Sequence, residues 1–404
     1  MSLRLDRVCF SFLFCLICQW SMVFSQVDLD LSRGEDVKNV IQFYISSQEL
    51  TTLKKARGEK LEFKKAKVKT EDGKKLVEKL RIRGQSSLSF DRKSFNVNLF
   101  FPHVFSWGNE TKALKEFYLI SLSMDENYYR SALSYHLLAQ LGLFTPFIAF
   151  TEVRINQESQ GIYLVVEKPH ENKMEVFHSP FVLRRGYHHE ISDIKFDKNN
   201  SSWKKADYLK AYDRLYELPN EFQGDSLYRE WNRILDMESY FTWLAFNYFM
   251  MNGDYSDELY LFALPESKEI RFGILPWDYD DILTGQPHKK EDYGFHEGWN
   301  HAFMFMAEED MDRVIGTDTF LQQKYLENVQ KLLSKITPEM LKSSFEKIYH
   351  ELYPYYKKPE IIQMSKYDLR GETNLKKFEE DFEAAFRYFV ARHNWLERLI
   401  GENR

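Results

Sequence analysis

Five carboxylates flank a short apolar hairpin in the second half of the sequence, and their spacing could support metal or proton-transfer chemistry. They are Asp254, Asp257, Glu258, Asp278 and Asp280. The hairpin is predicted over 259–264 and 270–275 because apolar residues fill both runs. In an antiparallel pair, the residue that enters one strand lies beside the residue that leaves its partner. The first three carboxylates are therefore expected to lie near the last two.

Such a cluster would need a positive partner. Several carboxylates at one end of a sheet repel one another unless a cation lies among them. Oxygen ligands without Cys or paired His favour Mg²⁺, Mn²⁺ or Ca²⁺ over zinc. Apolar neighbours such as Trp277 and Phe249 support the metal hypothesis, because carboxylates held against a buried strand need a partner. The alternative is a solvated acidic turn.

A second group of residues could contact an anion. Arg83 and Gly84 are followed by Ser86 and Ser87, and small residues between two strands let backbone N–H groups approach an anion closely. On the next strand, Lys93 has the same parity as the apolar positions, so its ammonium group is expected to point to the covered face. It would then need a carboxylate or a phosphate as partner. The alternative is a lysine that extends from the edge of the core into water.

Glu167 is the third candidate. It ends the apolar run that starts at Ile162. It could pair with Lys93 or line a ligand pocket, and the alternative is a structural or exposed residue at a strand end.

These candidates require a strand-rich half followed by a helix-rich half. Alternating apolar and polar residues predict mainly strands over 39–168, with a helix at 127–141 and a hairpin that turns at 159–161. The polar stretch 186–225 is predicted to be a connecting or mobile segment. After about residue 225, the 3.6-residue period of apolar positions predicts helices, one of which stops at Asn252-Gly253. The fold class is therefore expected to be α+β.

The N-terminus predicts export. Basic residues precede an apolar stretch, and small residues follow it, so residues 1–25 are expected to be a cleaved signal peptide; the alternative is an uncleaved anchor helix. All three cysteines lie in this stretch, which excludes disulfides and thiolate sites from the mature chain. No later segment is long enough to cross a membrane. The net charge is −6 and residues of both signs are spread along the chain, so no nucleic-acid partner is expected.

Four motifs together resemble the CotH family of atypical spore-coat protein kinases and their secreted relatives. They are Arg83-Gly84-Gln85-Ser86-Ser87 with Lys93-Ser94-Phe95, Gly161-Ile162-Tyr163-Leu164-Val165-Val166-Glu167, Asn252-Gly253-Asp254 with Tyr260-Leu261-Phe262, and Phe272-Gly273-Ile274-Leu275-Pro276-Trp277-Asp278-Tyr279-Asp280. They follow the family order and cover roughly residues 40 to 285, and the last motif is the most specific.

The resemblance implies one bilobal, kinase-like domain over 26–404, with an N-lobe at about 37–185 and a C-lobe at about 200–404. It implies ATP bound with Mg²⁺ or Mn²⁺ and phosphorylation of Ser or Thr hydroxyls on a protein partner. Lys93 would contact the phosphates, with Arg83, Ser86 and Ser87 in the same nucleotide site, and Glu167 would orient the nucleotide or line the adenine side. Asp254 would be the catalytic-loop acid. Asp278 would bind the metal, with Glu258 and Asp280 as further ligands.

One position departs from the family pattern. Where the family usually has an Asn as second metal ligand, this chain has Glu258, which adds a negative charge beside the triphosphate. This departure leaves open a catalytically weak, pseudokinase-like protein with a structural or coat-assembly role. A third possibility is a Ca²⁺-stabilised extracellular module whose aromatic residues contact glycan.

Overall fold

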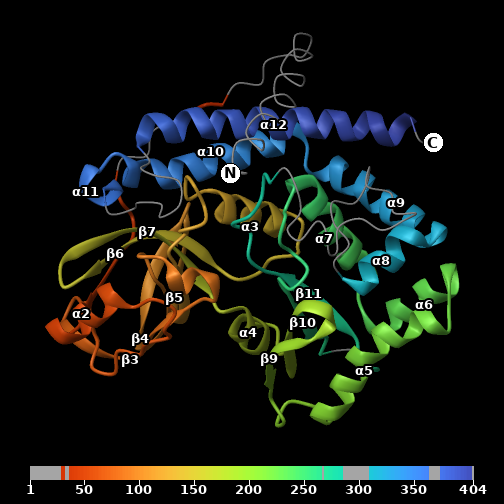
Figure 1. Ribbon diagram of the computed structural model, residues 1–404, viewed down its shortest axis with the longest axis horizontal. Helices are drawn as coiled ribbons and strands as arrows, with labels where there is room; N and C mark the ends of the chain where they lie inside the picture. Colours follow the sequence, from red (N-terminus) through yellow and green to blue (C-terminus); the bar gives the residue numbers. More distant parts are fainter. Residues whose placement is uncertain (1–28, 32–35, 266–267, 285–308, 364–373, 403–404) are drawn as a thin grey trace, which may run out of the picture.

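The computed structural model describes residues 29–31, 36–265, 268–284, 309–363 and 374–402. In the first half, seven strands form a closed barrel in the order β1–β2–β3–β4–β5–β7–β6 (Figure 1). The strands are β1 (Val40–Tyr44), β2 (Lys67–Thr70), β3 (Gly73–Arg83), β4 (Ser94–Trp107), β5 (Glu110–Ile120), β6 (Ile148–Ile155) and β7 (Glu158–Glu167). The parallel pairing of β1 with β6 closes the barrel.

Alternating side chains explain why these segments form a barrel. On β4, Phe95, Val97 and Leu99 are buried inside, whereas Asn96 and Asn98 face outward. β3 presents its apolar residues in the same way, and its pairing with β4 places Ile82 opposite Phe95. The barrel interior is therefore filled by side chains.

A second, four-stranded sheet has the order β11–β10–β8–β9. Its strands are β8 (Phe181–Arg185), β9 (Ile191–Phe196), β10 (Leu259–Ala263) and β11 (Phe272–Pro276). All three pairings are antiparallel. β8 thus pairs with the hairpin that carries the acidic residues, and β9 pairs with β8.

The remaining elements are mostly helices. Those within the first 234 residues are α2 (Ser47–Lys55), η1 (Ser86–Ser89), α3 (Arg130–Gln140), α4 (Pro169–Glu171), η2 (Asn172–Val176), η3 (Tyr187–His189), α5 (Lys205–Glu217), η4 (Leu218–Asn220) and α6 (Gly224–Ile234). The later ones are α7 (Met237–Met250), α8 (Asp310–Thr317), α9 (Thr319–Lys335), α10 (Pro338–Tyr356), α11 (Pro359–Ile362) and α12 (Leu375–Glu402). In Figure 1, α12 and α10 run along one side of the molecule, above α3.

Helix α7 leads into the acidic segment. Asp236 caps its N-terminus by accepting a hydrogen bond from the backbone N–H of Ser239, and Met251 ends it in a left-handed conformation with φ of 52°. Nearly every side chain of α7 is buried, as expected for a helix in the centre of a domain. The predicted stop at Asn252-Gly253 matches this end.

Two local predictions were wrong. The hairpin between β6 and β7 turns at Asn156 and Gln157, both with positive φ, and not at 159–161. A two-residue turn of this kind matches strand twist, and Asn tolerates the left-handed conformation. The stretch 186–225 holds β9 and α5 and is not merely a connection, because Tyr208, Tyr212 and Leu215 form a buried stripe on α5.

The predicted α+β class is confirmed by this mixture of sheets and helices. The predicted signal peptide at 1–25, with its cysteines, lies outside the described residues. Among the helices that are described, none combines the length and apolar character needed to span a membrane.

Candidate active site

The segments before β10 and after β11 lie side by side. The strand register places Leu259 opposite Pro276. Beyond the strands, the backbone N–H of Trp277 donates to the carbonyl of Glu258 at 2.9 Å, and that of Gly253 donates to the carbonyl of Asp281 at 3.1 Å. The structure thus brings the five predicted carboxylates to one end of the hairpin.

The carboxylates are close enough to perturb one another. Burial raises the pKa of Asp278, Arg83 and Arg184 oppose this rise, and Asp254 adds to it. Burial together with Asp278 and Asp281 raises the pKa of Asp280 well above its ordinary value. Asp257 also has a raised pKa, caused by burial and by Asp254. A bound cation would relieve this crowding of negative charge.

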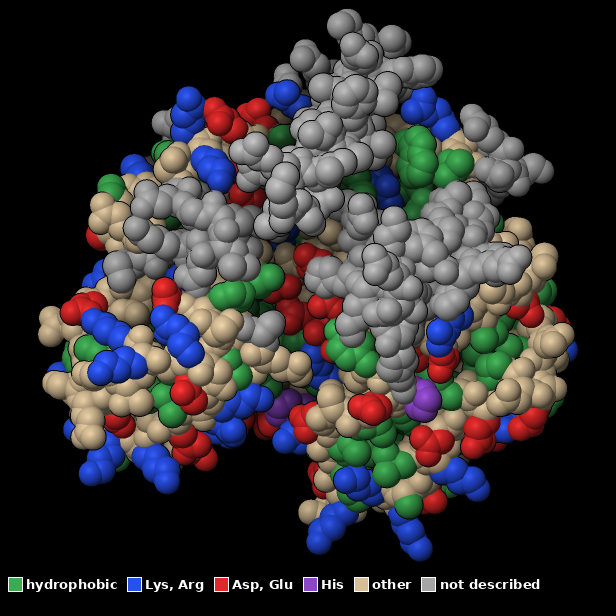
Figure 2. All heavy atoms as spheres, in the orientation of Figure 1, with side chains coloured by type: hydrophobic (Ala, Val, Ile, Leu, Met, Phe, Trp, Pro, Cys, Tyr) green, Lys and Arg blue, Asp and Glu red, His purple; other side chains and the backbone are tan. Residues whose placement is uncertain are grey.

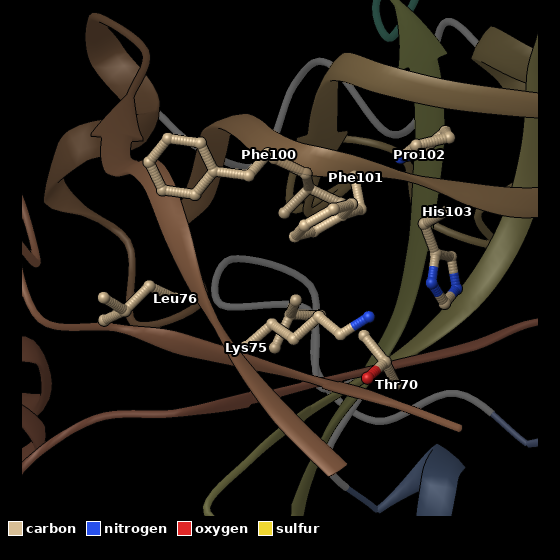
Figure 3. Close-up of a pocket in the computed structure, with 9 residues that line it drawn as sticks. Thr70, Lys75, Leu76, Phe100, Phe101, Pro102 and His103 are labelled. Atoms are coloured by element: carbon tan, nitrogen blue, oxygen red, sulfur yellow. The ribbon is translucent and has the colours of Figure 1, made fainter. Parts of the chain in front are cut away.

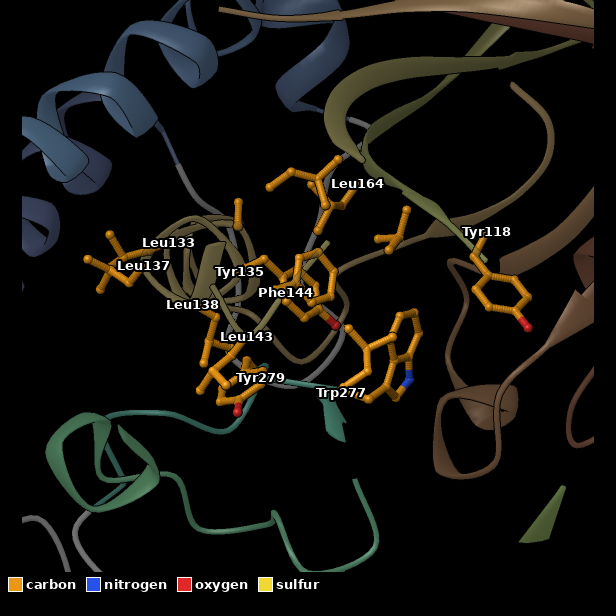
Figure 4. Packing of buried hydrophobic residues seen from close by; sticks show 14 of the residues in the cluster. Tyr118, Leu133, Tyr135, Leu137, Leu138, Leu143, Phe144, Leu164, Trp277 and Tyr279 are labelled. Atoms are coloured by element: carbon orange, nitrogen blue, oxygen red, sulfur yellow. The ribbon is translucent and has the colours of Figure 1, made fainter. Parts of the chain in front are cut away.

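Asp278 is held in a strained conformation by aromatic neighbours. Its φ is 45°, in the left-handed region that non-glycine residues rarely adopt. Its backbone N–H donates to the Tyr135 hydroxyl at 3.2 Å. Tyr135 lies 6.0 Å from Trp277 and 5.9 Å from Tyr279 between ring centroids (Figure 4). These two aromatic residues directly precede and follow Asp278 in the sequence. Such strain persists where the surroundings impose it, and it is typical of functional sites.

Glu258 is engaged by an arginine that the sequence did not identify. Arg184, on β8, contacts the Glu258 carboxylate at 2.5 Å. It lies opposite Tyr260 on the neighbouring strand. Burial raises the pKa of Glu258, and Arg184 opposes this rise. Metal ligation by Glu258 would require this carboxylate to be shared with Arg184.

Asp254 sits in a loop that buried amides brace. Its backbone N–H donates to the side-chain oxygen of Asn252 at 3.3 Å, and the Asn252 amide donates to Asn247 on α7 at 3.0 Å. The Tyr187 hydroxyl donates to the Asp254 carboxylate at 3.4 Å. Asp254 itself is half-buried, so its carboxylate can be reached from solvent.

Arg83 connects the barrel to the acidic segment. Its guanidinium lies 4.2 Å from the Tyr118 ring and 5.8 Å from the Trp277 ring. The loop that follows turns at Gly84, whose φ is 122°, and continues into η1, which begins with Ser86 and Ser87. Arg83 and Arg184 are the cations that act on Asp278.

Lys93 is buried, as its parity predicted. Its ammonium group donates to the carbonyl of Leu88 at 2.7 Å and to that of Phe90. These carbonyls of the preceding loop hold the ammonium group in place. The phosphate-binding role of Lys93 stays a prediction.

Glu167 has a different partner from the lysine that the sequence suggested. Both of its carboxylate oxygens accept from Lys112 at 2.8 Å. One oxygen also accepts from the backbone N–H of Phe147 and from the Asn172 amide, each at 2.9 Å. This network fixes the end of β7 at the start of the connection to the second sheet.

Sequence reasoning missed two contributors to this site. Arg184 lies at the end of a short strand just before the segment that was expected to be a connection, so no pattern marked it. Asn252 was quoted only as part of a motif, and its bracing role depends on the end of α7. Both depend on tertiary contacts.

The carboxylates suit a metal that is shared with phosphate. Mg²⁺ usually binds through one or two carboxylates together with substrate phosphates and water. Asp278 and Asp280 are half-buried and supply that number. Within the described ranges, no three His, Cys, Asp or Glu side chains are grouped to hold a metal by themselves. One oxygen of Asp257 is buried and has no hydrogen-bond partner among the described residues, which suits a site that binds a cation.

The space-filling view shows where acidic side chains gather. They line a hollow near the centre of the face in Figure 2, with basic side chains close by. A hollow lined by both acidic and basic side chains suits an anionic ligand that is bound together with a cation.

Comparisons with known proteins agree with the motifs. A family model described as CotH kinase protein matches residues 80–396. Inner spore coat protein H of Bacillus subtilis (strain 168) is 21% identical over 339 residues, which are 79% of this chain and 86% of that protein. Solved structures match as well, and two of them each cover 76% of this chain. The Helicobacter pylori proinflammatory kinase CtkA matches with 11% identity, a TM-score of 0.34 and 94% of its chain covered. HipA from Shewanella oneidensis MR-1, solved with HipB and operator DNA, matches with 13% identity, a TM-score of 0.31 and 65% coverage of the matched chain.

Proposed function

The chain belongs to the CotH kinase protein family, and we propose that it is a secreted protein kinase that uses ATP with Mg²⁺ or Mn²⁺ to phosphorylate Ser or Thr hydroxyls. We further propose that residues 1–25 are removed as a signal peptide. The bilobal arrangement, with an N-lobe at about 37–185 and a C-lobe at about 200–404, is part of this proposal.

One observation carries the proposal: carboxylates from the two segments that flank the hairpin converge near two arginines. Asp254 precedes β10, and Asp278 and Asp280 follow β11. Arg83 and Arg184 both act on Asp278. Phosphoryl transfer depends mainly on positioned charge, which this arrangement supplies.

Each side chain would have a distinct task. Asp254 would orient the acceptor hydroxyl and take its proton as the oxygen attacks the γ-phosphorus. The new bond joins that oxygen to phosphorus, while the bond to the bridging oxygen of ADP breaks. Arg83 and Arg184 would hold phosphate oxygens and neutralise their charge. A divalent ion on Asp278 and Asp280 would supply further neutralisation of the phosphates.

The alternative is a catalytically weak protein that uses the same surface for binding or coat assembly. The ion pair between Arg184 and Glu258 favours it, because this pair occupies the carboxylate that would hold a second metal. Transfer of labelled phosphate to a Ser/Thr-rich acceptor separates the two. If wild type is inactive and Glu258→Asn is active, the alternative holds; if wild type is already active, it fails.

A melting-temperature screen of nucleotides against divalent ions tests the proposal first. We expect stabilisation by ATP with Mg²⁺ or Mn²⁺ in wild type and its loss in Asp278→Asn. The matched control is Asp225→Asn, an exposed carboxylate on α6. Stabilisation by Ca²⁺ without any nucleotide effect would instead support the extracellular binding module.

A further inference from the structure

A group of exposed apolar side chains lies on the barrel. Four of the five most exposed large hydrophobic side chains in the described part of the chain belong to β3 and β4: Leu76 (52%), Phe100 (53%), Phe101 (56%) and Val104 (60%). Single exposed apolar residues are common, but a contiguous group indicates an interaction site. Figure 3 shows Phe100, Phe101 and Leu76 around a shallow pocket whose other side is formed by Thr70, Lys75 and His103.

A β-bulge causes this exposure. The pairing of β4 with β3 extends to Leu99, opposite Val77, and the pairing of β4 with β5 shifts register between Asn98 and His103. The residues between them leave the regular ladder, which turns both phenylalanines toward solvent. Bulges commonly redirect side chains in this way.

Positive charge surrounds the apolar group. Residues 60–79 contain eight lysines and only four acidic residues, in a chain whose net charge is −6. Lys69 lies directly opposite Lys74 across β2 and β3, and Lys67 lies opposite Leu76 on the same face. Like charges directly opposite each other are destabilising. An acidic partner would relieve this repulsion.

We propose that one face of β2 and β3 (Lys67, Lys69, Lys74 and Leu76), together with the adjoining bulge of β4 (Phe100 and Phe101), docks an acidic segment of a protein partner; we call these residues the β2–β4 surface. One apolar side chain of that segment would lie against the shallow hollow beside Leu76, Phe100 and Phe101, which is open to solvent. Lysines at fixed spacing along two paired strands suit an acidic peptide segment, because opposite charges in matching positions favour specific docking. The inference does not depend on the proposed kinase activity.

Fluorescence anisotropy of the full chain tests this proposal, with a labelled glutamate-rich peptide that carries one central phenylalanine as the probe. We expect salt-sensitive binding, because charge attracts the peptide. Phe101→Ser is expected to weaken binding about tenfold, as for a buried anchor. Lys69→Glu should weaken binding by at least about fivefold and also raise the melting temperature, since it replaces two opposed lysines by a Glu–Lys pair. Loss of folding alone cannot produce that combination.

The controls lie on another surface. Trp203→Ser and Lys198→Glu change an exposed aromatic and an exposed lysine outside the β2–β4 surface and should leave affinity unchanged. Equal affinity of wild type and Lys69→Glu would overturn the proposal, as would the absence of peptide binding. Binding of anionic phospholipid vesicles or duplex DNA in preference to the peptide would also contradict it.

Discussion

Asp278 combines backbone strain with crowding of negative charge. Its left-handed conformation is imposed by its aromatic neighbours. Its raised pKa has a separate cause, which is burial together with the nearby charge of Asp254. Such features cluster at functional sites because selection there favours function over stability. Substitutions of single residues in this site therefore test the proposed chemistry most sharply.

Asp254 is the residue whose loss should separate chemistry from binding. We expect Asp254→Asn to lower the rate of phosphate transfer by about 10²–10⁴-fold, because the amide cannot accept the hydroxyl proton. Affinity for Mg²⁺–ATP should stay close to that of wild type, since Asp278 and Asp280 remain. Labelled transfer and calorimetry on the same preparation measure the two effects. Equal loss of both would show that Asp254 acts in binding.

Asp125 provides a pH-dependent test of the buried charge beside α3. Burial raises its pKa to about 6, and Arg130 only partly opposes this. Because the folded pKa is raised, the protonated form stabilises the fold below about pH 4, and this contribution is lost as the pH rises through about 6. Asp125→Asn should therefore raise the free energy of unfolding by up to about 3 kcal/mol at pH 8 and by nearly nothing at pH 4.

Urea unfolding in metal-free buffer at both pH values measures this difference. Asp225→Asn, at an exposed site, serves as the control and should show little change at either pH. A similar gain for Asp125→Asn at pH 4 and pH 8 would contradict the assigned cause.

At the scale of elements, periodicity predicted most strands and helices, and the hairpin spacing predicted the meeting of the carboxylates. The turn between β6 and β7 was misplaced because Gly161 was a stronger turn signal than Asn156, whereas Gly161 lies within β7 with φ of 88°. The helix α5 was missed because its charged face hid a narrow buried stripe. Arg184 could not be found from sequence, since its partner Glu258 lies 74 residues away in the chain, just before β10.

The loop after β3 depends on its glycine for a measurable reason. A Cβ on Gly84 would lie 2.1 Å from the Ser87 hydroxyl oxygen, and its φ of 122° is strained for any L-residue. Gly84→Ala is expected to lower the free energy of unfolding by about 2–3 kcal/mol and to weaken nucleotide binding.

Gly58 is the matched control. Its φ is also positive, but a Cβ there would meet nothing within 4 Å. Gly58→Ala should therefore lower the free energy of unfolding only through backbone strain, by about 1 kcal/mol. Chemical denaturation compares the two variants, and equal losses would show that contact with Ser87 contributes nothing.

For the whole molecule, the barrel and the second sheet meet through Arg83 and its aromatic neighbours. Tyr118 of β5 lies 5.8 Å from Trp277 between ring centroids, and Arg83 stacks near both. This contact places the barrel's cation beside the carboxylates of the hairpin. We infer that a nucleotide binds between these two units, with its phosphates near Arg83 and Arg184.

Calorimetric titration of ATP, with and without Mg²⁺, into wild type and Asp278→Asn is the sharpest test of the proposed nucleotide site. We predict that wild type binds ATP only when the divalent ion is present, and that Asp278→Asn binds at least about tenfold more weakly because it loses a charged ligand. The same affinity in both proteins, or no nucleotide binding by wild type with Mg²⁺ or Mn²⁺, would contradict the proposed phosphate transfer.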